Sequence, residues 1–439
     1  MSIYDASSSP PRTSRTPRAS HPLRASRRTF LKWGAGIAAL GTLNFVSPVV
    51  RAQTTGSLGS DDEKRFEASR LAILNCQLAD GGIAQVGYRF TGNPVSVEPY
   101  FANLACLGLL AAQAYKPNAQ NLACVSRWIV WYADHQEADG TIQIVDGTRG
   151  SNGEIVNPEK KGQDSQDSYA ATYLSVVNQY FKASKVKPSA KVIAACLKCM
   201  DTLKRLRDDN GFYWNFVTPP PKVTPGQYLL DNVEVYEGLQ AAYELFTSLG
   251  DKTTADKAQK RATALANQMH LFWFAKEKYF VCLFGDKAAK TPWGRQPLSA
   301  EGLATVSALA FFKNVSSGTR STLWTRLMNT YKSQLEAGYC STQFGVEEPD
   351  VERVYLGALT SAPAAQQTTL LTQMRTRLDQ MLKRNQDLSD AGNAYQNAMQ
   401  GLDYAEVSRY GISIIALLAS KIPVATALPK VPLDPKNAP

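Results

Sequence analysis

Histidine is scarce in this chain. Only three occur in 439 residues, and only His135 and His270 lie beyond the first 52. Serine–histidine catalysis and histidine–metal centres both need this side chain. We therefore expect no metal and no cofactor, and we expect any catalysis to rest on carboxylates.

The seven cysteines form no disulfide framework that their spacing reveals. Their count is odd, and most lie within apolar stretches of helical periodicity. Cys196 and Cys199 form a single C-x-x-C on one predicted helix, with no second pair to complete a zinc site. This pattern is typical of thiols that pack as small hydrophobic side chains.

The positive charge of the chain lies mostly in its first 52 residues. That segment holds eight Arg and Lys residues against one Asp, which leaves a formal charge of only +3 on the remainder out of +10 overall. Because positive and negative charges are nearly balanced outside the first 52 residues, the sequence gives no indication of a nucleic-acid partner.

The same segment has the order of an export signal. Ser26-Arg27-Arg28-Thr29-Phe30-Leu31-Lys32 matches the twin-arginine pattern, an apolar run follows at 33–50, and Val50-Arg51-Ala52 offers a cleavage site. Glycines and Pro48 in the run argue against a lasting membrane span. We predict a signal peptide over 1–52, passage through the twin-arginine translocase, and a periplasmic or extracellular bacterial protein.

Strand signals are also few, and helical periodicity dominates the rest. Connections after even-numbered helical segments are short and those after odd-numbered ones long, so all long loops gather on one face. Odd segments are amphipathic, whereas even segments are apolar on all sides. This predicts six helical hairpins with an inner ring inside an outer one, an all-α (α/α)6 toroid over 53–421, followed by a Pro-rich tail over 422–439. The twelve helical segments are 61–76, 97–115, 119–135, 166–183, 188–206, 229–248, 252–274, 298–312, 318–336, 351–361, 364–384 and 403–420.

A weak repeat follows the first three odd segments. Asp80-Gly81, Asp139-Gly140 and Asn210-Gly211 occupy equivalent places, and such pairs form tight turns. We interpret them as turn formers rather than binding residues. A further long loop contains Tyr279-Phe-Val-Cys-Leu-Phe284, which predicts part of a short β-hairpin.

Carboxylates stand at the predicted N-terminal end of every inner helix, on the long-loop face. They include Glu98, Asp164, Asp167, Asp231, Glu234, Glu301, Glu347, Glu348, Asp350, Glu352, Asp403 and Glu406. Such residues can simply cap helices, and Asp164-x-x-Asp167, Asp231-x-x-Glu234 and Asp403-x-x-Glu406 loosely resemble capping boxes. Paired carboxylates are also what glycosidic cleavage needs, one protonated and one ionised.

Aromatic residues near these acids favour the second interpretation. Aromatic rings stack on the CH-bearing faces of sugars, although each could equally pack in the core. The candidates for substrate binding are Tyr100, Tyr169, Trp214, Trp293 and Tyr404.

The six-hairpin layout resembles the six-hairpin, (α/α)6-toroid glycosidase superfamily over essentially the whole mature chain. Asp164-Ser-Gln-Asp167-Ser-Tyr-Ala-Ala-Thr-Tyr-Leu is similar to the acid-rich start of an inner helix in several of its families, including inverting endoglucanases. Those enzymes also carry a Glu acid at the start of the first inner helix, where Glu98 lies. The resemblance implies a glycoside hydrolase acting on a poly- or oligosaccharide. Glu98 would be the general acid, Asp167 backed by Asp164 the base, and Asp231 with Glu234 a reserve pair.

Two other functions fit the same fold. A polysaccharide lyase would use Tyr169 as base and Arg353 to neutralise a uronate. A non-catalytic glycan-binding envelope protein would keep the toroid without the chemistry. Fold alone does not separate these functions.

Overall fold

The structure is a computed structural model of the whole chain. It describes residues 57–85, 91–163, 165–217, 225–274, 278–285, 304–305, 308–309, 316–337, 364–390 and 407–418. The signal peptide predicted over 1–52 and the tail over 422–439 lie outside these residues, as does the predicted helix 351–361 and most of 298–312.

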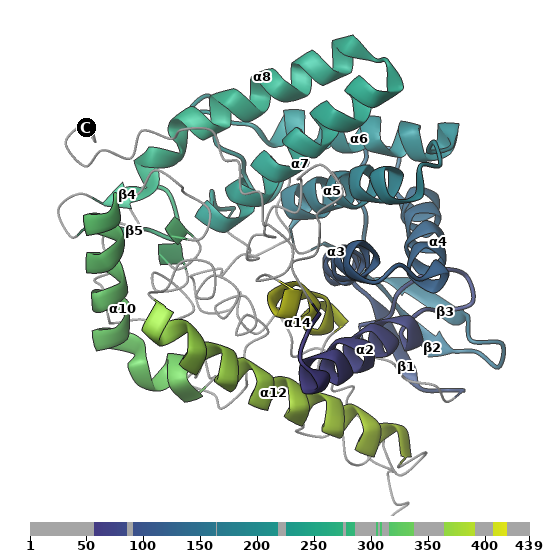
Figure 1. Cartoon of the computed structure of the whole chain (residues 1–439). Coiled ribbons are helices and arrows are strands. Elements are labelled where there is room, and N and C mark those ends of the chain that lie inside the picture. The colour runs from purple at the N-terminus through teal and green to yellow at the C-terminus, as the bar shows by residue number, and fades with distance from the viewer. Residues whose placement is uncertain are drawn as a thin grey trace, which may run out of the picture.

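The helices form two concentric rings, which confirms the predicted (α/α)6 toroid (Figure 1). The inner helices in the described residues are α3 (Pro99–Tyr115), α5 (Gln166–Ser184), α7 (Leu229–Leu249) and α14 (Val407–Leu418). Around them lie α2 (Ser60–Asn75), α4 (Ala119–His135), α6 (Ala190–Leu206), α8 (Lys252–Gln268), α10 (Ser317–Ala337) and α12 (Ala364–Asp390).

Burial separates the two rings as the sequence predicts. Every residue of α14 is buried, and so is every residue of α3 from Pro99 to Ala112. The outer helix α8 instead buries only one stripe, composed of Ala255, Ala258, Ala262, Leu265 and Ala266. A helix that is apolar on all sides belongs in the interior, and a helix with one apolar stripe belongs at its boundary.

Glycines let neighbouring inner helices touch backbone to backbone. A Cβ built on Gly108 of α3 would lie 2.4 Å from the Cα of Gly411 on α14. A Cβ on Gly238 of α7 would lie 2.6 Å from the Cα of Ala171 on α5. Both separations are far below a carbon–carbon contact, so only glycine fits at these crossings.

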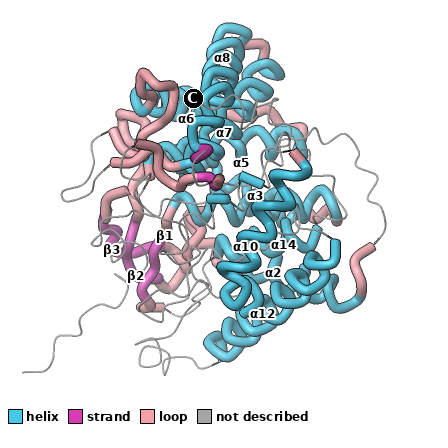
Figure 2. Tube along the Cα trace, turned by 90° about the vertical axis from the view of Figure 1, so that its left-hand side faces the viewer, coloured by secondary structure: helices cyan, strands magenta, loops and turns pink. Residues whose placement is uncertain are grey.

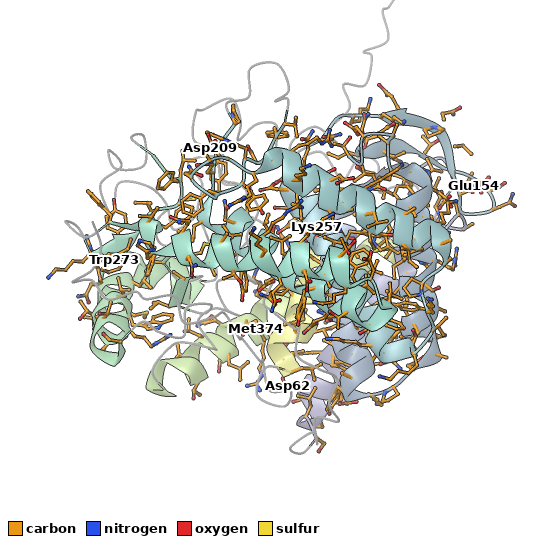
Figure 3. The ribbon with its side chains drawn as sticks, turned by 90° about the horizontal axis from the view of Figure 1, so that it is seen from above. Asp62, Glu154, Asp209, Lys257, Trp273 and Met374 are labelled. Carbon is orange, nitrogen blue, oxygen red and sulfur yellow. The ribbon has the colours of Figure 1, made fainter. Side chains whose placement is uncertain are left out.

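The long loops carry two small sheets, of which the three-stranded one lies at one side of the molecule (Figure 2). β1 (Pro94–Val97), β2 (Val145–Arg149) and β3 (Ile155–Lys160) form an antiparallel sheet, and Glu154, in the β2–β3 turn, lies at the outer edge (Figure 3). This sheet was not predicted, because β2 and β3 are polar and contain Gly147 and Pro158. β2 pairs with the distant β1, where Val97 lies opposite Val145, and with β3 of the same loop, where Val145 lies opposite Lys160.

The predicted helix 252–274 is too long. Helix α8 ends at Gln268, a 3-10 turn (η2, Met269–Phe272) follows, and β4 (Trp273–Phe274) then pairs with β5 (Tyr279–Phe280). Aromatic side chains pair across this hairpin, and the ring centroids of Trp273 and Phe280 lie 4.9 Å apart. This pairing overrides the helical periodicity. The predicted β-hairpin is thereby confirmed, with its strand shortened to Tyr279–Phe280.

The repeated Asp-Gly and Asn-Gly pairs are turns, as predicted. In each, the glycine has a positive φ, and its N–H donates to the carbonyl three residues earlier at 3.0–3.1 Å. The preceding side chain accepts from the N–H two residues further on, at 2.9–3.0 Å. Each turn packs against the next outer helix, where the first contacts Arg127 and the second contacts Lys198. The three glycines are Gly81, Gly140 and Gly211.

Charged residues close the ring between its first and last outer helices. Arg65 of α2 donates twice to Asp379 of α12, both at 2.7 Å, and Arg375 of α12 donates to both oxygens of Asp62. Figure 3 shows Asp62 and Met374, the neighbour of Arg375, on the same side of the molecule. Helix α2 also packs against α14. In the part of the chain that the structure describes, no helix has the length and apolarity to cross a membrane.

Candidate active site

Four of the predicted acids are buried at the N-terminal ends of three adjacent inner helices. Glu98 precedes α3, Asp167 lies in the first turn of α5, and Asp231 and Glu234 lie near the start of α7. None exposes more than 3% of its surface. Buried carboxylates are costly unless other groups hold them, so their surroundings matter.

These acids do not act mainly as helix caps. Glu98 occupies the N-cap position of α3, yet its side chain makes no capping hydrogen bond. The N-cap of α7 is Tyr228, so Asp231-x-x-Glu234 is not a capping box, and the N-cap of α5 is Ser165 rather than Asp164. Asp164 and Asp403 themselves lie outside the described residues. The capping-box interpretation is therefore wrong for Asp231 and Glu234, the one pair that the structure describes in full.

Glu98 is held by donors from two directions. The Gln85 side chain donates to Oε2 at 2.8 Å, and the Tyr169 hydroxyl lies 3.4 Å from Oε1. The Gln85 main chain is itself fixed, because its carbonyl accepts from the N–H of Val407 on α14 at 2.7 Å. Donors of this kind favour an ionised carboxylate.

Tyr100 links the first inner helix to the third. Its hydroxyl donates to Oε1 of Glu234 at 2.5 Å, and its ring stacks on Tyr169 with centroids 6.4 Å apart and planes 15° apart. Helix α5, which carries Tyr169, packs between α3 and α7. Glu98, Tyr169, Tyr100 and Glu234 therefore form one connected network across three inner helices.

The two carboxylate oxygens of Asp167 differ in their hydrogen bonds. Oδ1 accepts from the Ser165 hydroxyl at 2.6 Å and from the Ser168 N–H at 2.9 Å. Oδ2 is buried and has no hydrogen-bond partner among the described residues. Complete burial raises the pKa of Asp167 to about 7, although the hydrogen bonds from Ser165 and Ser168 oppose the shift. This carboxyl can hold a proton near neutral pH.

The charges of Asp167 and Asp231 both act on the hydroxyl of Tyr228. The pKa of Tyr228 is raised first by burial, then by the sulfur of Cys282 and by the charges of Asp231 and Asp167. Helix α7, which carries Asp231 near its N-terminal end, packs against α5.

The predicted aromatic residues have unequal surroundings. Tyr100 and Tyr169 are buried and contact the acids. Trp214 is half-buried against the hydrophobic core. Trp293 and Tyr404 lie outside the described residues. As substrate-stacking residues, all five remain predictions.

Sequence reasoning missed three polar residues at this site. Gln85 holds Glu98, Ser165 holds Asp167, and Ser168 lies beside Asp167 with a fully buried side chain. Ser165 and Ser168 stand in the acid-rich motif and could have been found there. Gln85 has no local signal, because the chain brings it to Glu98 through the first long loop.

No group of three or more His, Cys, Asp and Glu side chains in the described residues is arranged to hold a metal ion. Cys196 and Cys199 are free and buried, and the Cys199 sulfur accepts a hydrogen bond from Gln136 at 3.3 Å. Burial raises the pKa of the Cys199 thiol to about 12, which makes it a poor metal ligand.

Comparison with known proteins places the fold. No protein-family model matches the chain, and no curated protein matches it in sequence. Solved structures match it in fold. A wild-type glycosidase superposes with a TM-score of 0.51 at 11% sequence identity, and the superposition covers 84% of this chain and 100% of the other. A glycosidase variant in complex with glucose superposes with a TM-score of 0.51 at 12% sequence identity and with the same coverage. At such low identity these likenesses establish the shared fold, a toroid of two helical rings.

Proposed function

We propose that the chain is an exported glycoside hydrolase that cleaves a poly- or oligosaccharide by paired-carboxylate chemistry. The observation that carries this proposal is the burial of Glu98, Asp167, Asp231 and Glu234 at the N-terminal ends of α3, α5 and α7, which pack side by side. Glycoside hydrolysis needs one carboxyl that donates a proton and one that stays ionised. The glycosidases that share the architecture support the same class of reaction.

The surroundings favour roles for Glu98 and Asp167 that reverse those expected from the sequence. Asp167 has a pKa of about 7 and an oxygen without a protein partner, which suits a general acid. Glu98 accepts from Gln85 and lies beside the Tyr169 hydroxyl, which suits an ionised base or nucleophile. In this proposal Asp167 protonates the glycosidic oxygen as the C–O bond breaks, and Glu98 activates water or attacks the anomeric carbon.

A glycan screen with the purified chain starting at Gln53 tests this proposal. We expect new reducing ends from at least one poly- or oligosaccharide, without the ultraviolet absorbance of unsaturated products. One glycosidase of this architecture was solved with glucose, so glucose-containing glycans come first in the panel. Products with that absorbance would instead identify a lyase. Binding without cleavage across a broad panel would contradict the hydrolase and favour a glycan-binding protein.

We also propose that residues 1–52 direct export through the twin-arginine translocase. The pattern around Arg27 and Arg28, the apolar run that follows and Ala52 support this proposal. Expressed in a bacterium with that pathway, the exported chain should begin at Gln53 by N-terminal sequencing. Replacing both Arg27 and Arg28 with Lys should retain the precursor in the cytoplasm. Export of this variant at the unchanged level would rule the route out.

A further inference from the structure

The first turn of α5 holds two buried polar atoms that no described protein group satisfies. They are Oδ2 of Asp167 and Oγ of Ser168, and both residues are 0% exposed. Leaving such atoms without a partner costs about 1–3 kcal/mol each. Two of them on adjacent residues, beside the carboxylates of the candidate active site, point to a ligand that supplies the missing partners.

Ser168 lacks a partner because of its place in the helix. Thr172 and Ser175 on the same helix donate to the carbonyls four residues before them, Thr172 to Ser168 at 2.6 Å and Ser175 to Ala171 at 3.3 Å. Helix α5 begins at Gln166, so Ser168 has no residue of α5 four positions before it. It therefore lacks the bond to such a carbonyl that Thr172 and Ser175 make.

The contacts of α5 show which way Ser168 faces. Ala171, three residues on, packs against Gly238 of α7. Thr172, four residues on, accepts a hydrogen bond from Asn103 of α3 at 2.9 Å. The outer side of α5 carries Tyr173, whose hydroxyl donates to Ile129 of α4 at 3.0 Å. Since α3 and α7 flank α5 in the inner ring, Ser168 lies on the strip that faces the axis of the toroid.

We propose that Ser168 and Asp167 Oδ2 form a sugar-binding subsite, in which Ser168 is a substrate-positioning residue. The subsite takes a pyranose ring with neighbouring hydroxyl groups, because one hydroxyl can bond to Ser168 Oγ while the adjacent oxygen bonds to Asp167. Ser168 thereby fixes the ring whose glycosidic oxygen receives the proton. This inference rests on the proposed function and assigns a residue that the acid-rich motif alone did not single out.

Ser175 provides a matched control. It lies on the same axis-facing strip two turns further along α5, and it is also buried. Unlike that of Ser168, its hydroxyl already donates to a protein carbonyl. Ser168→Ala removes a hydroxyl that bonds nothing in the free protein, so thermal stability should stay the same or rise. Ser175→Ala removes one intact hydrogen bond without touching the subsite.

The experiment measures binding of D-glucose, D-galactose and D-mannose, and of their monodeoxy derivatives, to the wild type and both variants by calorimetric titration. We expect Ser168→Ala to weaken binding of the preferred sugar about tenfold, equal to about 1.4 kcal/mol. We expect Ser175→Ala to leave it unchanged. One deoxy sugar should lose affinity for the wild type but bind Ser168→Ala as the parent sugar does.

Three results would overturn the subsite: no binding of any of the three sugars to the wild type, equal affinity in Ser168→Ala and wild type, or a fall in melting temperature that explains the loss. Glycan hydrolysis together with any of these leaves the proposed function standing and removes only the subsite. Binding that depends on Ser168, without hydrolysis in the glycan screen, keeps the subsite and removes the hydrolase.

Discussion

Replacing Asp167 with Asn is expected to lower kcat on a cleaved glycan by about 10²- to 10⁴-fold, the usual contribution of a general acid. The amide keeps the shape of the side chain but cannot transfer a proton to the leaving oxygen. Because Asp167 is completely buried, the isosteric change is preferable to alanine, which would leave a cavity. Glu98→Gln should show a loss of similar size, since it removes the second carboxylate of the pair.

Asp209→Asn is the matched control for this experiment. Asp209 lies in the third repeated turn and is exposed, whereas the four acids are buried. Its variant should keep wild-type kcat, and circular dichroism should show that all three variants are folded. Wild-type turnover by Asp167→Asn would exclude the acid role outright.

The pH dependence of kcat separates the two assignments of roles. With Asp167 as the acid, the active form is protonated, so kcat should fall about tenfold per pH unit above a pKa of about 7. With Asp167 as the base, kcat should instead rise with pH up to about 7. The second profile would restore the roles expected from the sequence, with Glu98 as the acid.

Gly108→Ala is expected to lower the free energy of unfolding by about 2–3 kcal/mol, near the upper part of the range for overpacked cores. The new methyl group would meet the backbone of Gly411, and a backbone cannot rotate away as a flexible side chain can. The higher helix propensity of alanine returns only about 1 kcal/mol. Urea denaturation followed by circular dichroism measures the difference.

The control for this change is Gly318→Ala on α10. Gly318 is exposed, and a Cβ there would have no heavy atom within 4 Å. This variant should match the wild type or be slightly more stable. A Gly108 variant as stable as the Gly318 variant would show that α3 and α14 do not cross as tightly as described.

The periodicity of the sequence predicts the toroid because it is repeated in each hairpin. Helices such as α5 and α7 are long and apolar on all sides, and α7 matches its predicted range, 229–248, to within one residue. The three-stranded sheet could not be predicted in this way, since Val97 and Val145 come from different loops. Local pattern carries no information about such pairing.

The position of four acids at neighbouring helix starts could be predicted from the sequence, but their connections could not. The acids stand at helix starts in the sequence, which places Glu98, Asp167, Asp231 and Glu234 at one end. The hydrogen bonds from Tyr100 to Glu234 and from Gln85 to Glu98 depend instead on how the inner helices and the first long loop pack together. The burial that raises the pKa of Asp167 is likewise a property of the whole assembly.

The closure of the ring also sets an order of events during synthesis. Asp62 and Arg65 on α2 leave the ribosome early, whereas Arg375 and Asp379 follow 313 and 314 residues later. At about 5–20 residues per second, α2 waits roughly 15–60 s for its partners on α12. The ring of the nascent chain therefore stays open at α2 until the C-terminal helices emerge. During that interval chaperones can shield the exposed edge of α2.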